Sequence, residues 1–243
     1  RLLLEVNAAV DQARDDGVTP LLMACQEGHA EIIQLLLEAG AAVKQAAMRG
    51  ATPLYIACQN NHLEIVRLLL EANAAIDQAT NNGFTPLRVA SQNDHLEIVR
   101  LLCAAGAAVD QADEQGATPL LMACQEGHLE CVRLLLEAGA AVSQACNNGS
   151  TPLSMACLNG HLEVAKLLSS YGASRAATRF GTPVEIANSQ GHADLAAWLV
   201  ASRGWTPLQH LEACPRLAAE GVSALSSRPL HLFRRRSPSS GRG

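Results

Sequence analysis

The sequence predicts an all-α fold, a solenoid in which one helical unit is repeated along a single axis. Thr-Pro recurs at a strict spacing of 33 residues, beginning at Thr19, Thr52, Thr85, Thr118 and Thr151. Hydrophobic residues make up 49% of the chain and aromatic residues only 3%, and its many Ala and Leu residues favour helices over strands. Since a fixed period of about 20–50 residues is typical of repeat proteins, this register decides the architecture.

Each unit is expected to begin with a short helix. Thr52 can cap that helix with its hydroxyl, and Pro53 suits the first helical position because it needs no N–H partner there. The helix should end near Asn61. Gly28 holds this position in the first full unit, where a left-handed backbone ends the helix, and Asn61 and Asp94 tolerate that conformation better than most residues do.

A second helix is expected from about residue 62 to residue 72. Apolar side chains cover most of its circumference: Leu63, Ile65, Val66, Leu68, Leu69 and Leu70. The exception is a polar stripe of Glu64, Arg67 and Glu71, which we interpret as a solvated outer face. A helix with so much apolar surface must lie between neighbours, and stacking of successive units supplies them.

The unit that starts at Gly17 and the unit that starts at Gly116 agree at 24 of 33 positions. Their shared pattern, G-x-T-P-L-x-x-A-x-x-G-H-x-E-I-V-x-L-L-L-x-x-G-A, resembles the ankyrin repeat. The resemblance implies an ankyrin-repeat α-solenoid with β-hairpin-like fingers between helix pairs. It divides residues 1–213 into a partial repeat at 1–16, full repeats from 17, 50, 83, 116 and 149, a shortened repeat at 181–204 and a capping half-repeat at 205–213, which should cover the last core face.

The C-terminal tail, residues 214–243, is rich in Arg, Ser, Pro and Gly and is expected to be disordered. Arg234, Arg235 and Arg236 precede Ser237-Pro238, which leaves three interpretations: a localisation signal, a phosphorylation-tuned binding segment, or a solvated tail without a role. Because the chain begins at Arg1, inside a helical pattern, we expect it to be a fragment or a processed product.

Recurrence also explains the residues that would otherwise suggest a catalytic or metal site. Six of the eight histidines share one position at the start of the second helix, where we expect a hydrogen bond to the adjoining loop; they are His29, His62, His95, His128, His161 and His192. Cys25, Cys58, Cys124 and Cys157 share one position on the short helix, and there is no C-x-x-C. We therefore predict no enzyme activity, cofactor or metal site in this chain.

Charge and hydropathy limit the classes of partner that the chain can bind. The net charge is −5, of which residues 205–243 contribute +4 and the remaining body −9. An acidic body argues against nucleic-acid binding, and no apolar stretch approaches the roughly 20 residues of a membrane helix. Cysteines used as small hydrophobes indicate a reducing, intracellular setting, so we predict a cytoplasmic monomer, with the nucleus as an alternative.

The resemblance implies that a protein partner binds the concave face, which the fingertips and short helices form. The predicted site residues are Tyr55, Arg88 and Leu121 after T-P-L; Gln59, Asn60, Gln92, Asn93, Gln125 and Glu126 at the ends of short helices; and Asn81, Asn82, Glu114 and Gln115 at fingertips. Tyr55 and Arg88 either anchor the partner, as residue types enriched at interface hot spots, or pack against adjacent fingers. The sequence leaves both open.

Two further positions depart from the family pattern. The Asp expected before each finger turn is present as Asp113 but replaced by Ala47, Thr80 and Cys146, so we expect those three fingers to be looser. The slot that holds the Asn of V-N-A, a target of asparaginyl hydroxylases in many ankyrin repeats, holds other residues: Asp11, Lys44, Asp77, Asp110 and Ser143. Asparagine hydroxylation at that slot is therefore excluded.

The sequence predicts a protein-binding scaffold or adaptor. Two alternatives remain open. The chain could be the substrate-recruitment region of a larger enzyme, a ubiquitin ligase or kinase, whose catalytic domain precedes Arg1. It could also be an effector delivered into the cytoplasm of another organism.

Overall fold

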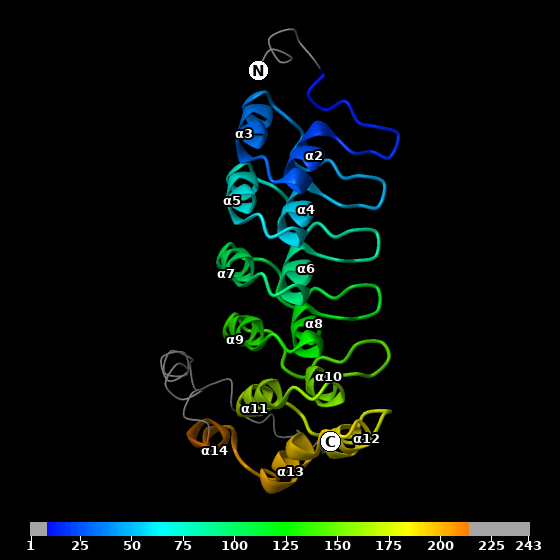
Figure 1. The fold of residues 1–243 in the computed structure, drawn as a ribbon, viewed down its shortest axis with the longest axis vertical. Coiled ribbons are helices and arrows are strands. Elements are labelled where there is room, and N and C mark those ends of the chain that lie inside the picture. The colour runs from blue at the N-terminus through cyan, green and yellow to red at the C-terminus, as the bar shows by residue number, and fades with distance from the viewer. Residues whose placement is uncertain (1–8, 214–243) are drawn as a thin grey trace, which may run out of the picture.

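The structure, a computed structural model, describes residues 9–213. The predicted tail and the first half of the partial repeat lie outside these residues. Figure 1 shows an elongated stack, with successive helix pairs on one side of the molecule and a row of loops on the other. The predicted all-α solenoid is confirmed.

The helices form two layers (Figure 1). The inner layer, next to the loops, consists of α2 (Pro20–Glu27), α4 (Pro53–Gln59), α6 (Pro86–Gln92), α8 (Pro119–Glu126), α10 (Pro152–Leu158) and α12 (Pro183–Ser189). The outer layer consists of α3 (Ala30–Glu38), α5 (Leu63–Glu71), α7 (Leu96–Ala104), α9 (Leu129–Glu137), α11 (Leu162–Ser170) and α13 (Ala193–Ala201). A last short helix, α14 (Pro207–Glu212), follows them.

Each inner helix begins as the sequence predicts. The hydroxyl of Thr52 accepts a hydrogen bond from the Tyr55 N–H at 3.1 Å, and Pro53 occupies the first helical position. The hydroxyl of Thr85 accepts from the Arg88 N–H in the same way at 3.1 Å. These caps fix the direction in which every inner helix leaves its loop.

The core lies between the two layers and between successive repeats. Its largest fully buried side chains are aliphatic: Leu21, Ile33, Leu54, Ile65, Leu69, Leu87, Ile98, Leu102, Leu120, Leu135, Leu136 and Leu153. Adjacent inner helices pack against one another along the stack, as do adjacent outer helices from α3 to α11. Each repeat therefore completes the core of its neighbour, so stability is mostly a sum of nearest-neighbour contacts.

The fingers, residues 14–18, 47–51, 80–84, 113–117 and 146–150, are tight turns closed by backbone hydrogen bonds. In the second of them the Ala47 N–H donates to the carbonyl of Ala51 at 3.0 Å. Neighbouring fingers are joined as well, since the Asn81 N–H donates to the carbonyl of Arg49 at 3.0 Å. In the described residues the β pairing is an isolated bridge between Thr178 and Gly181, so the fingers are hairpin-like without regular strands.

The repeated histidines join neighbouring repeats. The His128 ring nitrogen Nε2 lies 2.9 Å from the carbonyl oxygen of Gln92 in the preceding inner helix, and His161 makes the same contact with Gln125 at 2.9 Å. We predicted a bond to the histidine's own adjoining loop, and that prediction is wrong. The previous repeat supplies the carbonyl because its inner helix ends there with unpaired acceptors.

The residue in the slot where the ankyrin pattern has Asn joins neighbouring repeats by a hydrogen bond in the outer layer, which we call the clasp. One carboxylate oxygen of Asp77 accepts a hydrogen bond from the Ala108 N–H of the next repeat at 2.9 Å. Asp11, Asp110 and Ser143 make the equivalent bond at 2.8 to 2.9 Å. Lys44 cannot, because an ammonium group has no acceptor atom.

At the C-terminal end, the last helix does not lie where the predicted cap would place it. We expected residues 205–213 to cover the last core face, but α14 packs chiefly against α11 in the outer layer. Val200 on α13 is left 59% exposed. The physical reason lies in the contacts of His210, which is buried between Trp198 and Trp205 and holds α14 on the outer side of the stack.

Candidate protein-binding groove

Three cavities follow one another along the concave face of the described residues. The first, about 560 Å³, lies between α4 and the fingers and ends at Phe84; the second, about 420 Å³, begins at Phe84 and runs beneath α8. The third, about 330 Å³, lies between α10 and α12 and shares Asn148, Ser150 and Met155 with the second. Because neighbouring cavities share walls, we describe them together as the concave groove.

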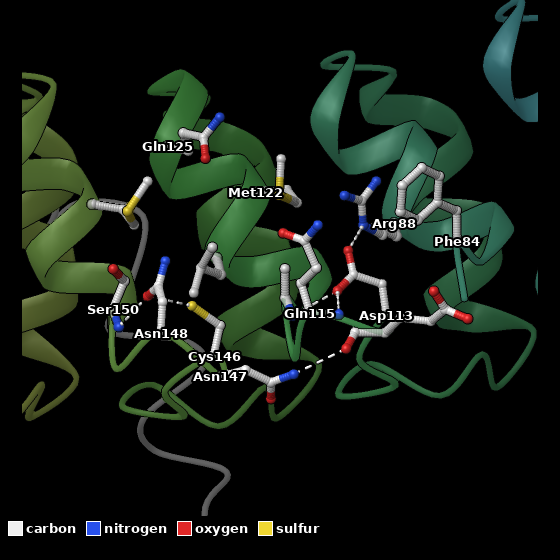
Figure 2. Close-up of a pocket in the computed structure, with 14 residues that line it drawn as sticks. Phe84, Arg88, Asp113, Gln115, Met122, Gln125, Cys146, Asn147, Asn148 and Ser150 are labelled. Carbon is white, nitrogen blue, oxygen red and sulfur yellow. Dashed lines mark hydrogen bonds and ion pairs between the residues drawn. The ribbon is translucent and has the colours of Figure 1, made fainter. Parts of the chain in front are cut away.

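The floor of the middle cavity contains a buried ion pair (Figure 2). The Nε atom of Arg88 donates to a carboxylate oxygen of Asp113 at 3.0 Å, and its Nη1 atom donates to Gln92 at 3.0 Å. The guanidinium also lies over the ring of Phe84, 3.8 Å from the centroid. Arg88 is only 6% exposed, and burial lowers its pKa while Asp113 raises it.

Asp113 connects this ion pair to the finger that follows. Its second carboxylate oxygen accepts hydrogen bonds from the N–H groups of Gln115 and Ala117, both at 2.9 Å. Asn147 in the next finger donates to the carbonyl of Glu114 at 2.9 Å, as Figure 2 shows. The polar wall of the groove is therefore a set of side chains that are already hydrogen-bonded, which makes its shape rigid.

Apolar side chains line the opposite parts of the groove. Met122 on α8 and Met155 on α10 contribute to the middle cavity. Toward the C-terminal end the lining becomes more apolar, with Leu158 40% exposed and Phe180 52% exposed. Exposed apolar side chains gathered at one place on a surface are typical of a binding site.

The predicted site residues fall into three groups by exposure. Gln59, Asn60, Asn81, Asn82, Asn93, Glu114, Gln115 and Glu126 are exposed; Gln92 and Gln125 are half-buried; Tyr55, Arg88 and Leu121 are buried. For Arg88 the structure shows the packing contact with the adjacent finger. The anchoring of a partner by Tyr55 and Arg88 stays a prediction.

Two of the fingers predicted to be looser have a replacement acceptor. The hydroxyl of Thr80 accepts from the Phe84 N–H at 3.1 Å. In the finger that starts with Cys146, the side chain of Asn148 accepts from the Ser150 N–H at 2.8 Å. Looseness caused by a missing acceptor is therefore wrong for these two fingers, because the replacing Thr80 in one and the neighbouring Asn148 in the other supply an acceptor oxygen.

The apolar part of the groove was not predicted from the sequence. Phe84, Met122, Met155 and Leu158 line it, and none of them was among the predicted site residues. A signal was present: the second residue after T-P-L is apolar in every unit, and Met23 at this position is 41% exposed. The sequence does not show which side of a short helix stays open, so recurrence alone could not identify these residues as part of the groove.

The repeated cysteines are poor nucleophiles. Burial raises the pKa of the Cys25 and Cys157 thiols to about 12 and raises that of Cys124 well above its usual value. These thiols remain neutral at physiological pH, and a neutral thiol is neither a nucleophile nor a metal ligand. Within residues 9–213 no three His, Cys, Asp or Glu side chains are grouped so that they could hold a metal ion.

The architecture defines a helical repeat solenoid with a groove along the face formed by the fingers and the inner helices. A family model described as "Ankyrin repeats (3 copies)" matches residues 40–113 and 105–179, and a model described as "Ankyrin repeat" matches residues 16–46. The chain belongs to the ankyrin-repeat family, and its repeats form a protein–protein interaction module. No curated protein matches it. Among the described residues, no helix is long and apolar enough to cross a membrane.

Proposed function

We propose that this chain is a scaffold or adaptor that binds a protein partner along the concave groove. The observation that carries the proposal is the continuity of the three cavities, which share lining residues from the finger at Arg49 to the end of α12. A groove that spans several repeats, with hydrogen-bonding groups on one wall and apolar side chains on the other, suits an extended segment of a protein.

The chemistry of the lining supports a protein over a small molecule. Exposed amide and carboxylate groups, such as Asn82, Glu114 and Gln115, can pair with peptide N–H groups, and Leu158 and Phe180 can cover apolar side chains. The recruitment region of a larger ubiquitin ligase or kinase would use the same groove. We further propose a cytoplasmic monomer that does not bind nucleic acid, on the basis of its neutral free thiols and acidic body.

Affinity capture with matched variants tests the proposal. Gln115→Arg with Phe180→Asp changes the groove at two exposed side chains, whereas Ile32→Asp changes the outer helix α3 at a side chain that is 47% exposed. We expect the wild-type chain and Ile32→Asp to retain the same proteins, and the groove variant to lose them with an unchanged melting temperature. Partners that bind all three chains equally would refute the groove as the binding site.

A further inference from the structure

We propose that residues 230–236 of this chain, Leu-His-Leu-Phe-Arg-Arg-Arg, bind the C-terminal part of its own concave groove and compete there with the protein partner. The inference rests on the proposed function, because it concerns the same groove. It follows from the chemistry of two adjoining cavities, from the sequence of the segment and from the length of chain that joins the two.

The cavity between α10 and α12 requires an apolar occupant. Met155, Leu158, Phe180 and Ile186 line it, and the side chains of Leu158 and Phe180 are 40% and 52% exposed. Burial of an exposed aromatic or aliphatic side chain is favourable because it removes apolar surface from water. An occupant with one large apolar side chain at this point therefore gains the most.

The neighbouring cavity adds a preference for positive charge. Its only described cation, Arg88, is buried and neutralised by Asp113 at 3.0 Å, while Glu114 is exposed at its rim. Glu126 is also exposed, beside Gln125, from which it accepts a hydrogen bond at 2.9 Å. A cation placed over this cavity meets the exposed carboxylate of Glu114 in its lining, and Glu126 follows the lining residue Gln125 in the chain.

Arg179 sets the direction of the occupant. Its guanidinium lies 4.6 Å from the centroid of the ring of Phe180, which lines the apolar cavity, whereas Glu114 lines the middle cavity. Positive charge is therefore disfavoured beside Phe180 and favoured in the middle cavity, next to α8. The groove suits a segment in which a large apolar residue is followed by cations that point toward α8.

In residues 230–236 a large apolar residue is followed by cations, as the groove requires. Phe233 follows two leucines and precedes Arg234, Arg235 and Arg236. In an extended chain, residues three apart are separated by about 10 Å, and adjacent packed helices lie about 8–10 Å apart. With Phe233 beside α10, Arg236 therefore lies one repeat away, beside the carboxylates near α8.

The connecting chain is long enough. The described residues end at Ala213, next to α14, which packs against α11, and α11 packs against the groove helix α10. Two helix spacings amount to about 20 Å, whereas the 20 residues from Ala213 to Phe233 can span up to about 66 Å. The cavity at the open end of α12 and α13 is lined by Arg175 and Arg203 and by one carboxylate, Glu185, so its lining carries a net positive charge and suits the same segment less well.

A competition experiment with the full chain tests the inference. The probe is a labelled synthetic peptide of residues 229–237, and its dissociation constant is measured by fluorescence anisotropy. In Phe233→Ala/Arg235→Ala/Arg236→Ala the tethered segment is disabled, so we expect the peptide to bind at least about tenfold more tightly than to wild type, because a tethered competitor acts at an effective concentration near millimolar. Leu225→Ala/Arg228→Ala, which removes one apolar side chain and one cation elsewhere in the tail, should bind as wild type does.

A second pair of variants locates the binding site. Added to the triple variant, Phe180→Asp should abolish peptide binding, whereas Val200→Asp, on the exposed face of α13, should leave it unchanged. Equal peptide affinity of wild type and triple variant overturns the inference, and so does a wild-type dimer that the triple variant converts to a monomer, since the segment then occupies a second copy. If Phe180→Asp still removes captured partners in those cases, the proposed function stands without the tail.

Discussion

The junctions between central repeats and the C-terminal end of the stack are held together by different kinds of contact. Between central repeats the same three hydrogen bonds recur: finger to finger, histidine ring to preceding helix, and aspartate to following loop. They join residues separated by 31 to 37 positions, close to the length of one repeat. A contact that recurs at about the repeat length can be predicted for every repeat once it is known for one.

The C-terminal end is held by contacts that occur once. The guanidinium of Arg175 donates to the carbonyl oxygens of Leu199 and Ser202 and to the hydroxyls of Ser169 and Ser202, at 3.0 to 3.3 Å. It also lies 5.1 Å from the centroid of the Trp198 ring. One side chain thus connects α11 to the end of α13, in place of the outer-layer packing of the earlier repeats. The contacts that hold the C-terminal end are specific to that end and do not follow from the repeat pattern.

The largest difference in stability should appear between the loss of buried Arg88 and the loss of half-buried Arg175. Arg88→Ala leaves the buried carboxylate of Asp113 without its cation, which costs about 3–5 kcal/mol of unfolding free energy. Arg175→Ala leaves neutral hydroxyl and carbonyl groups unpaired, which costs about 1–3 kcal/mol. Urea unfolding followed by circular dichroism measures both, with the exposed Arg67→Ala as control. Equal losses of unfolding free energy in Arg88→Ala and Arg175→Ala would contradict the expectation that an unpaired carboxylate costs more than unpaired neutral groups.

The second comparison uses two glycines with the same backbone conformation. Gly127 and Gly191 both end an inner helix, with φ +82° and +79°. A Cβ on Gly127 would lie 2.5 Å from the His161 ring of the next repeat, whereas a Cβ on Gly191 would meet nothing within 4 Å. Gly191→Ala should therefore cost only the left-handed strain, about 1–2 kcal/mol.

Gly127→Ala should cost about 2–4 kcal/mol, since displacement of the His161 ring adds to that strain. Calorimetric or urea unfolding of both variants measures the difference. The double variant Gly127→Ala/His161→Ala is the control, because it should lose no more than His161→Ala and the backbone strain together. A cost for Gly191→Ala as large as for Gly127→Ala would show that the ring is not involved.

Most of the repeat region could be predicted because its residues recur. The 33-residue register located the caps, the buried helices and the structural histidines and cysteines. It did not show that each histidine binds the preceding repeat, because a carbonyl acceptor has no sequence signature. It also missed the pairing of Arg88 with Asp113, which lie 25 residues apart and each occupy their position in the repeat only once. The end could not be predicted, because α14 turns toward α11 through contacts made after the repeat pattern has ended.

Replacement of Lys44 can add a clasp hydrogen bond to the outer layer, whereas replacement of Asp77 removes one. By the 33-residue register, position 44 corresponds to Asp77 and Ala75 to Ala108, but Lys44 offers no acceptor for the Ala75 N–H. Lys44→Asp should raise the unfolding free energy by about 0.5–1.5 kcal/mol, and Asp77→Ala should lower it by a similar amount. Urea unfolding measures both changes. A gain for Lys44→Asn equal to that for Lys44→Asp would assign the effect to the hydrogen bond alone, whereas no gain for either would contradict the clasp.

The smallest effect is expected from pH and should be confined to the C-terminal end. His210 is 4% exposed between Trp198 and Trp205, with ring centroids 5.5 and 5.3 Å away, and its Nδ1 has no hydrogen-bond partner among the described residues. Burial, and then the charge of Arg175, lower the pKa of His210 below its usual value of about 6.5. Below about pH 6.5 the unfolded C-terminal end therefore binds more protons than the folded end. The contribution of neutral His210 to the stability of this end is fully present above about pH 6.5 and is lost as the pH falls below about 6.5 toward the lower pKa of the folded state.

The two tryptophans report this change directly, because they are the only ones in the chain and both contact His210. Urea midpoints measured by tryptophan fluorescence should fall between pH 7.5 and pH 5.5 by more than the midpoints measured by circular dichroism. His210→Phe keeps a ring between the two indoles and removes the titrating group, so it should abolish the difference. The central histidines contact carbonyl oxygens, which accept a hydrogen bond from a protonated ring as well as from a neutral one. A parallel fall of both signals in His210→Phe would place the pH sensitivity in the repeats and not at the end.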